Sequence, residues 1–122
     1  MVTTKSRGDA GEAFALAHLK RAGLVLVERN YRVARGRGAP GGEVDLIMRD
    51  TRGTLVFVEV RTRAALAPVA AAASVDAAKQ RRLRFAACHY LRRFATPPAC
   101  RFDVVAIDGE RLNWLVAAFD AG

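Results

Sequence analysis

The chain has 122 residues, of which 52% are hydrophobic and 26% charged, as expected for one ordinary globular domain. Its formal net charge of +8 favours an anionic polymer such as nucleic acid as a partner, although many basic proteins bind none. No stretch approaches the roughly 20 apolar residues that span a bilayer, and no apolar run follows the basic start of the chain. We therefore expect a single cytoplasmic domain over residues 1–122, flexible at 1–7 and without a membrane partner.

Hydrophobic periodicity predicts an alternation of helices and strands along the whole chain. The expected order is helix, three strands, helix, two strands, over residues 8–21, 24–33, 43–49, 54–63, 76–94, 101–107 and 111–116. Gly23 is a natural stop for the first helix, and the first strand is interrupted near Asn30. Pro97 and Pro98 end the second helix. Residues 34–42 form a basic, glycine-rich loop that we expect to be exposed.

The second and third strands form a hairpin whose register follows from its turn. If Asp50 pairs with Thr54 around a three-residue loop with Gly53 in the left-handed conformation, residues whose numbers have the same sum face each other. The apolar residues at 44, 46 and 48 then oppose those at 60, 58 and 56, and this face must pack under a helix. On the other face, Asp45 lies directly opposite Glu59. At a cross-strand separation of about 5 Å, two carboxylates repel unless a cation lies between them.

Asp45 and Glu59 are hard oxygen ligands of the kind that Mg²⁺ or Mn²⁺ takes together with water and substrate phosphate. Such an ion suits phosphodiester hydrolysis, because it activates water and stabilises the leaving oxyanion. Arg61 projects from the same face as Glu59 and can hold a phosphate, but it cannot act as a base at neutral pH. The alternative is that both carboxylates form salt bridges with Arg61 and Arg63 on a solvated sheet face.

Two polar residues on the helices favour the metal site over the surface salt bridges. Glu12 aligns with Leu16 and Leu19, so its carboxylate points inward, where an unpaired charge is costly. Gln80 shares a helical stripe with Leu83. The alternative interpretation of Glu12 and Gln80 is that each is a partly buried, hydrogen-bonded residue near a helix end, without a functional role. Three acids, one amide and one arginine directed at a single sheet face nevertheless form a coherent set.

The second helix has a cationic outer face, because no acidic residue occurs between Ala77 and Phe102. We expect this face, the glycine-rich loop and the end of the third strand to contact phosphates. The residues expected to bind nucleic acid are Arg35, Arg37, Arg63, Lys79, Arg81, Arg82 and Arg84.

Six motifs in order, covering nearly the whole chain after Arg7, carry a resemblance to a known family. They are Gly11-Glu12, RNYR at 29–32, GEVDLI at 42–47, VFVEVRTR at 56–63, KQRRL at 79–83 and RFDVV at 101–105. Together they resemble the YraN-like family of small bacterial proteins, which has a restriction-endonuclease-like fold similar to that of archaeal Holliday-junction resolvases. The resemblance implies a three-layer α/β (α+β) fold of order αβββαββ, with a mixed sheet of about five strands flanked by helices.

The resemblance also implies a PD-(D/E)xK type site, with Asp45 and Glu59 as metal ligands and Glu12, Arg61 and Gln80 as further catalytic members. Arg61 stands where active nucleases of this fold usually carry lysine. The main hypothesis is a nuclease or nuclease-like protein that uses Mg²⁺ or Mn²⁺ on DNA, including branched or structured DNA, and that can act as a homodimer. One alternative is a non-catalytic nucleic-acid-binding or assembly protein with the same fold. Another is a protein-interaction module whose basic helix binds an acidic partner.

Overall fold

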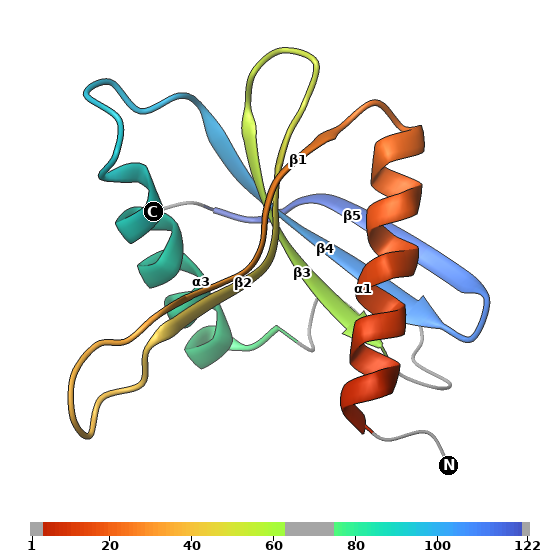
Figure 1. Cartoon of the computed structure of the whole chain (residues 1–122), viewed down its shortest axis with the longest axis horizontal. Coiled ribbons are helices and arrows are strands. Elements are labelled where there is room, and N and C mark those ends of the chain that lie inside the picture. The colour runs from red at the N-terminus through yellow and green to blue at the C-terminus, as the bar shows by residue number, and fades with distance from the viewer. Residues whose placement is uncertain (1–3, 63–74, 121–122) are drawn as a thin grey trace.

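A five-stranded mixed sheet with one helix against each face forms the framework of the protein (Figure 1). The structure, a computed structural model, describes residues 4–62 and 75–120. Its elements are α1 (Thr4–Arg21), β1 (Val25–Val33), β2 (Gly42–Arg49), β3 (Leu55–Thr62), α3 (Ala77–Leu91), β4 (Cys100–Asp108) and β5 (Arg111–Phe119). This order and the three-layer arrangement confirm the predicted restriction-endonuclease-like fold class. In the described ranges, no helix is both long and apolar enough to cross a membrane.

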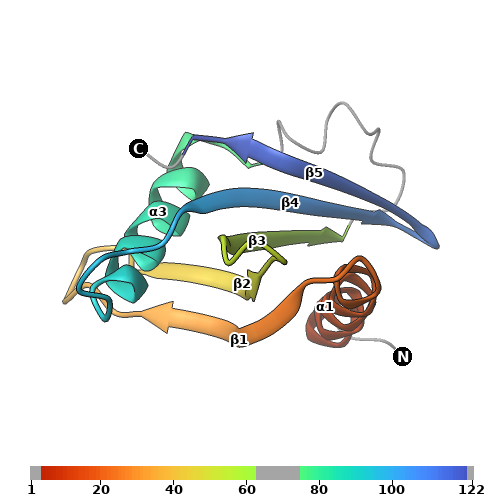
Figure 2. The ribbon, with the colours of Figure 1, turned by 90° about the horizontal axis from the view of Figure 1, so that it is seen from above.

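The strands lie in the sheet in the order in which they occur in the chain, β1 to β5, as Figure 2 shows. All neighbours are antiparallel except β3 and β4, which pair in parallel from Leu55 with Cys100 to Thr62 with Ile107. A parallel pair needs a long connection that crosses over the sheet. The helix α3 lies in this connection and covers the face opposite α1.

The turn between β2 and β3 has the predicted geometry. The backbone N–H of Asp50 donates to the carbonyl of Thr54 at 3.0 Å, and Gly53 has φ of +88°. The carboxylate of Asp50 accepts from the N–H groups of Arg52 and Thr54, both at 2.9 Å. The pairs from Leu46 with Val58 to Arg49 with Leu55 confirm the predicted register next to this turn.

The two faces of the sheet carry separate hydrophobic clusters. Ala15, Leu16 and Leu19 of α1 pack on the face formed by Leu46, Met48, Val56 and Val58. On the other face, Leu83, Ala86, Ala87 and Tyr90 of α3 pack with Val44, Ile47, Phe57 and Phe102. The expectation that Val44 shares a face with Leu46 is therefore wrong. The backbone pairing of β2 with β3 stops at Leu46, and Gly42 lies so close to α3 that a Cβ there would be 2.7 Å from the Ala86 nitrogen.

Several element boundaries differ from the predicted ones, and β5 extends to Phe119, beyond the predicted end at 116. The helix α1 begins at Thr4, so it includes residues 4–7, which were expected to precede it. The helix α3 ends at Leu91. The N–H groups of Arg92 to Phe94 donate to carbonyls three residues earlier in the chain, which is the pattern of a 3₁₀ turn and not of an α-helix. β1 continues through Asn30, which takes φ of +51° in place of the expected interruption. The end of the third predicted strand at position 63 lies outside the described residues.

Candidate functional site

Two buried carboxyl groups lie side by side where β2 and β3 separate. The exposed fractions of Asp45 and Glu59 are 9% and 3%. Backbone pairing between the two strands ends at Leu46 and Val58. Beyond this point the N–H of Val60 donates to the Asp45 carboxylate, at 2.8 Å, and not to a backbone carbonyl of β2. The two carboxyl groups lie close enough that each shifts the pKa of the other. We call these two residues the acid pair.

The acid pair retains a proton at neutral pH. Burial first, and then the charge of Asp45, raise the pKa of Glu59 to about 8 against the opposing charge of Lys79. Burial also raises the pKa of Asp45, whereas the hydrogen bond from Val60 opposes this shift. A protonated Glu59 can donate its O–H to Asp45, which relieves the repulsion between two buried carboxylates.

Two cations approach the same oxygen of Glu59. The Lys79 Nζ of α3 lies 3.2 Å from Glu59 Oε2, and the Arg61 Nη1 lies 3.4 Å from it. The alternative of surface salt bridges predicted solvated carboxylates, but those of Asp45 and Glu59 are buried. Of its two expected cations, Arg61 contacts Glu59, and Arg63 lies outside the described residues.

Glu12 lies among polar residues of β1. Its carboxylate is 3.9 Å from the Arg29 guanidinium. With the amide nitrogen of Asn30 turned toward it, Asn30 donates to both Glu12 oxygens at 3.0 and 3.2 Å. In the part of the chain that the structure describes, no group of three or more His, Cys, Asp or Glu residues could hold a metal ion. Asp45 and Glu59 therefore form a two-carboxylate set, without Glu12 as a third ligand in this conformation.

Gln80 holds the start of α3. Its Nε2 donates to the carbonyl of Val75 at 3.0 Å, and its Oε1 accepts from Arg84 at 3.3 Å. Asp76 caps the same helix end by accepting from the N–H of Lys79 at 2.8 Å. These contacts fix the first turn of α3, which carries Lys79 to the acid pair.

Cavities with mainly cationic linings follow one side of α3, and two of them lie between α3 and the connection from β1 to β2. We call these cavities together the basic groove. It consists of three adjoining cavities of about 250, 220 and 500 Å³. The cavity nearest the acid pair is lined by Arg61 and Lys79, and it shares Arg82 with the second cavity. The basic and aromatic side chains along the groove are Arg35, Arg61, Lys79, Arg81, Arg82, Phe85, His89 and Arg92.

Not every expected nucleic-acid-binding residue lines this groove. Arg84 turns toward the C-terminal strand, where its Nε donates to the carbonyl of Asp120 at 3.1 Å and its guanidinium lies 5.6 Å from the Phe119 ring centroid. Arg37 is exposed in the loop. Arg92 also lines the groove. It was absent from the predicted set, although it fell within the helix predicted over residues 76–94.

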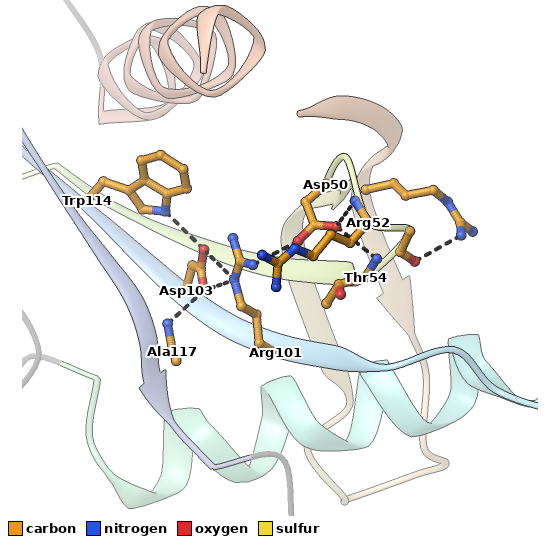
Figure 3. A network of polar contacts seen from close by, with 9 residues as sticks. Asp50, Arg52, Thr54, Arg101, Asp103, Trp114 and Ala117 are labelled. Atoms are coloured by element: carbon orange, nitrogen blue, oxygen red, sulfur yellow. Dashed lines mark hydrogen bonds and ion pairs between the residues drawn. The ribbon is translucent and has the colours of Figure 1, made fainter. Parts of the chain in front are cut away.

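A buried network centred on Asp103 is the largest polar feature that the sequence did not reveal. The Asp103 carboxylate accepts from Trp114 Nε1 and the Ala117 N–H, each at 2.9 Å, and from Arg101 Nε at 3.0 Å (Figure 3). Arg101 continues to Asp50 at 3.1 Å. The network ties β4 and β5 to the β2–β3 turn, at the opposite end of β3 from Glu59. The only sequence signal was an acidic residue inside an apolar strand.

A mixed five-stranded sheet between two helices, with a buried carboxylate pair on adjacent strands, places this chain among the restriction-endonuclease-like α/β proteins. The sequence matches the model of the Uncharacterised protein family UPF0102 over residues 11–107, and the chain belongs to this family. The predicted membership of the YraN family is thereby confirmed.

Relatives match over almost the whole chain. The UPF0102 protein of Methylibium petroleiphilum (strain PM1) is 66% identical over 99% of both chains. The UPF0102 protein of Acidovorax sp. (strain JS42) is 62% identical over 98% of this chain and 88% of its own. That of Cupriavidus pinatubonensis is 57% identical over 97% and 88%, respectively.

Proposed function

We propose that this protein is a metal-dependent nuclease-like protein that acts on nucleic acid, with DNA as its substrate. The observation that carries the proposal is the buried acid pair, which lies next to the basic groove because Lys79 and Arg61, two residues of the groove lining, both contact Glu59. Buried carboxyl groups with raised pKa values concentrate at functional sites, because burying them is costly for a purely structural role.

The donor set of the acid pair fits a small divalent cation. Mg²⁺ and Mn²⁺ are bound through one or two carboxylates, and waters and substrate phosphate complete the coordination. Burial and the charge of Asp45 raise the pKa of Glu59 to about 8, and the proton that Glu59 then retains is the charge that such an ion would replace. When bound, the ion supplies an activated water and stabilises the charge on the leaving oxygen.

The cations beside the acid pair have distinct proposed roles. Arg61 stays protonated at neutral pH, so it holds a phosphate oxygen and does not transfer a proton. Lys79 comes from α3 and reaches Glu59 at 3.2 Å, closer than the 3.4 Å of Arg61. Active nucleases of this fold usually carry a lysine where this chain has Arg61. We propose that Lys79 supplies the ammonium charge of that lysine. It orients the phosphate against the acid pair.

Cleavage assays test this proposal directly. Purified protein should cut linear, nicked, flapped or four-way DNA in the presence of Mg²⁺ or Mn²⁺. Asp45→Asn and Glu59→Gln should abolish cutting and leave the circular dichroism spectrum unchanged, whereas the exposed Glu110→Gln serves as the matched control. Failure to cut any of these substrates with either ion would refute the hydrolytic part of the proposal.

A second candidate is a nucleic-acid-binding or assembly protein without hydrolysis. Arg61 at the usual lysine position favours it, as does the two-carboxylate donor set of the described residues. Affinity would then depend on salt and on Arg81 and Arg82, and not on a divalent ion. Calorimetry that shows Mn²⁺ binding to the wild type but not to Asp45→Asn would contradict this candidate.

A further inference from the structure

The three cavities of the basic groove form one path along α3. Arg35 and Phe85 line both of the farther cavities, and Arg82 lines both of the nearer ones. From Ala78 to Arg92 the path follows about 21 Å of helix at 1.5 Å per residue. It ends beside the acid pair, where Lys79 contacts Glu59. Cationic side chains therefore line the groove from its far end to the proposed catalytic site.

Phe85 is an aromatic residue inside this cationic path. Among residues 4–62 and 75–120, it belongs to neither hydrophobic cluster, although its neighbours Ala86 and Ala87 belong to the α3 core. The Arg35 guanidinium lies 4.8 Å from the centroid of its ring. Aromatic faces and guanidinium planes are the surfaces on which unpaired bases stack. A half-buried aromatic ring outside the core, with cations beside it that can bind phosphates, has the features of a surface on which a base stacks.

The loop wall of the groove is anchored against the helix. At Gly42, a Cβ would lie 2.7 Å from both the Arg82 oxygen and the Ala86 nitrogen, so only glycine permits this approach. Gly36 and Gly38 have φ of +104° and +79°, conformations that glycine adopts without strain. Both views place the connection from β1 to β2 at the same end of the sheet as α3 (Figures 1 and 2). The groove is therefore walled on two sides.

We infer that the basic groove binds a single nucleic-acid strand, which lies along α3 with one base stacked on Phe85 and leads its backbone to the acid pair. This inference rests on the proposed function for its end point and names the class of substrate. A duplex keeps its base faces within its own stack, so it offers nothing to Phe85 unless it is first unpaired. An unpaired strand offers both the base face and the phosphates.

Binding without metal ions tests the path separately from hydrolysis. Fluorescence anisotropy in EDTA compares a 12-nucleotide single strand with a blunt duplex of the same sequence, over a range of salt concentrations. Wild type should bind the single strand more tightly. Phe85→Leu should weaken this binding about fivefold or more and leave duplex binding unchanged. Arg92→Gln should reduce the slope of log affinity against log salt by about 0.7.

Arg111→Gln is the control, because Arg111 is an exposed cation at the start of β5 and does not line the groove. It should leave both affinity and slope near wild type. Equal or tighter duplex binding, or a Phe85→Leu effect that is the same on both probes, would overturn the inference. So would an equal effect of Arg111→Gln and Arg92→Gln. If binding behaves as expected and cleavage is absent, only the hydrolytic proposal fails.

Discussion

The proton of the acid pair makes the stability of this fold depend on pH. In the unfolded chain, Glu59 titrates near 4.5, whereas its pKa in the folded protein is about 8. The folded state therefore binds more protons than the unfolded state between these values, and the free energy of unfolding falls as pH rises through this range. The shift from 4.5 to about 8 sets an upper limit of about 5 kcal/mol on the loss.

Glu59→Gln removes this titration with little change in shape. The amide can still donate to Asp45, and its oxygen can still accept from Lys79 and Arg61. We expect the variant to lose most of the decline in stability between pH 5 and pH 8. At pH 8 it should be more stable than wild type, and at pH 5 the two proteins should be nearly equal.

Urea denaturation at pH 5, 6, 7 and 8, followed by circular dichroism, measures the effect. The control is Glu110→Gln, which removes an exposed carboxylate in the β4–β5 turn and should keep the wild-type decline. A wild-type stability that is flat or rises from pH 5 to pH 8 would refute the raised pKa of Glu59. A Glu59→Gln variant that is less stable than wild type at pH 8 would do the same.

Three further predictions concern the ion, the buried network and the groove wall. Mn²⁺ affinity should rise between pH 6 and pH 8, because the ion displaces the proton of Glu59; calorimetry in buffers of different ionisation enthalpy should show proton release, and a pH-independent dissociation constant would contradict it. Asp103→Asn should lower the free energy of unfolding by about 2–3 kcal/mol, since a charged acceptor of Trp114 and the Ala117 N–H is lost; urea denaturation measures this, and a loss under 0.5 kcal/mol would argue against the network. Gly42→Ala should cost about 1–3 kcal/mol by overpacking against α3 and weaken single-strand binding, and an unchanged anisotropy titration would show that the groove wall does not matter.

Local chemistry made the β2–β3 hairpin predictable. Asp50, Gly53 and Thr54 specify a turn whose hydrogen bonds lie within five residues, and the turn fixes the register of the strands that leave it. The predicted register holds only as far as Leu46 and fails from Asp45 onward. There the strands separate, and a side chain replaces the backbone as the partner of Val60. Periodicity assumes continuous pairing, so it could not show that Val44 crosses to the α3 face.

The hydrophobic periodicity of the sequence could not predict which side chains of different helices and strands contact one another. The helical pattern indicated that Glu12 faces inward, but its partners depend on how α1 crosses β1 and on the left-handed backbone of Asn30. The cationic face of α3 was visible in the sequence. Which cation of α3 reaches Glu59 depends on the angle at which α3 packs on the sheet: Lys79 does, whereas Arg84 turns to Asp120. The network of Asp103 likewise required a partner strand that follows it in the chain.

Lys79 connects the two proposed activities of the site. Its charge lowers the pKa of Glu59, and it lies at the end of the basic groove. A phosphate that draws Lys79 away from Glu59 removes a cation from the acid pair, and the pair then favours either its proton or a divalent ion more strongly. An ion that binds first repels Lys79 and frees it for the phosphate. On the proposed function, ion and nucleic acid should therefore bind with positive coupling, and by linkage each must raise the affinity of the other by the same factor.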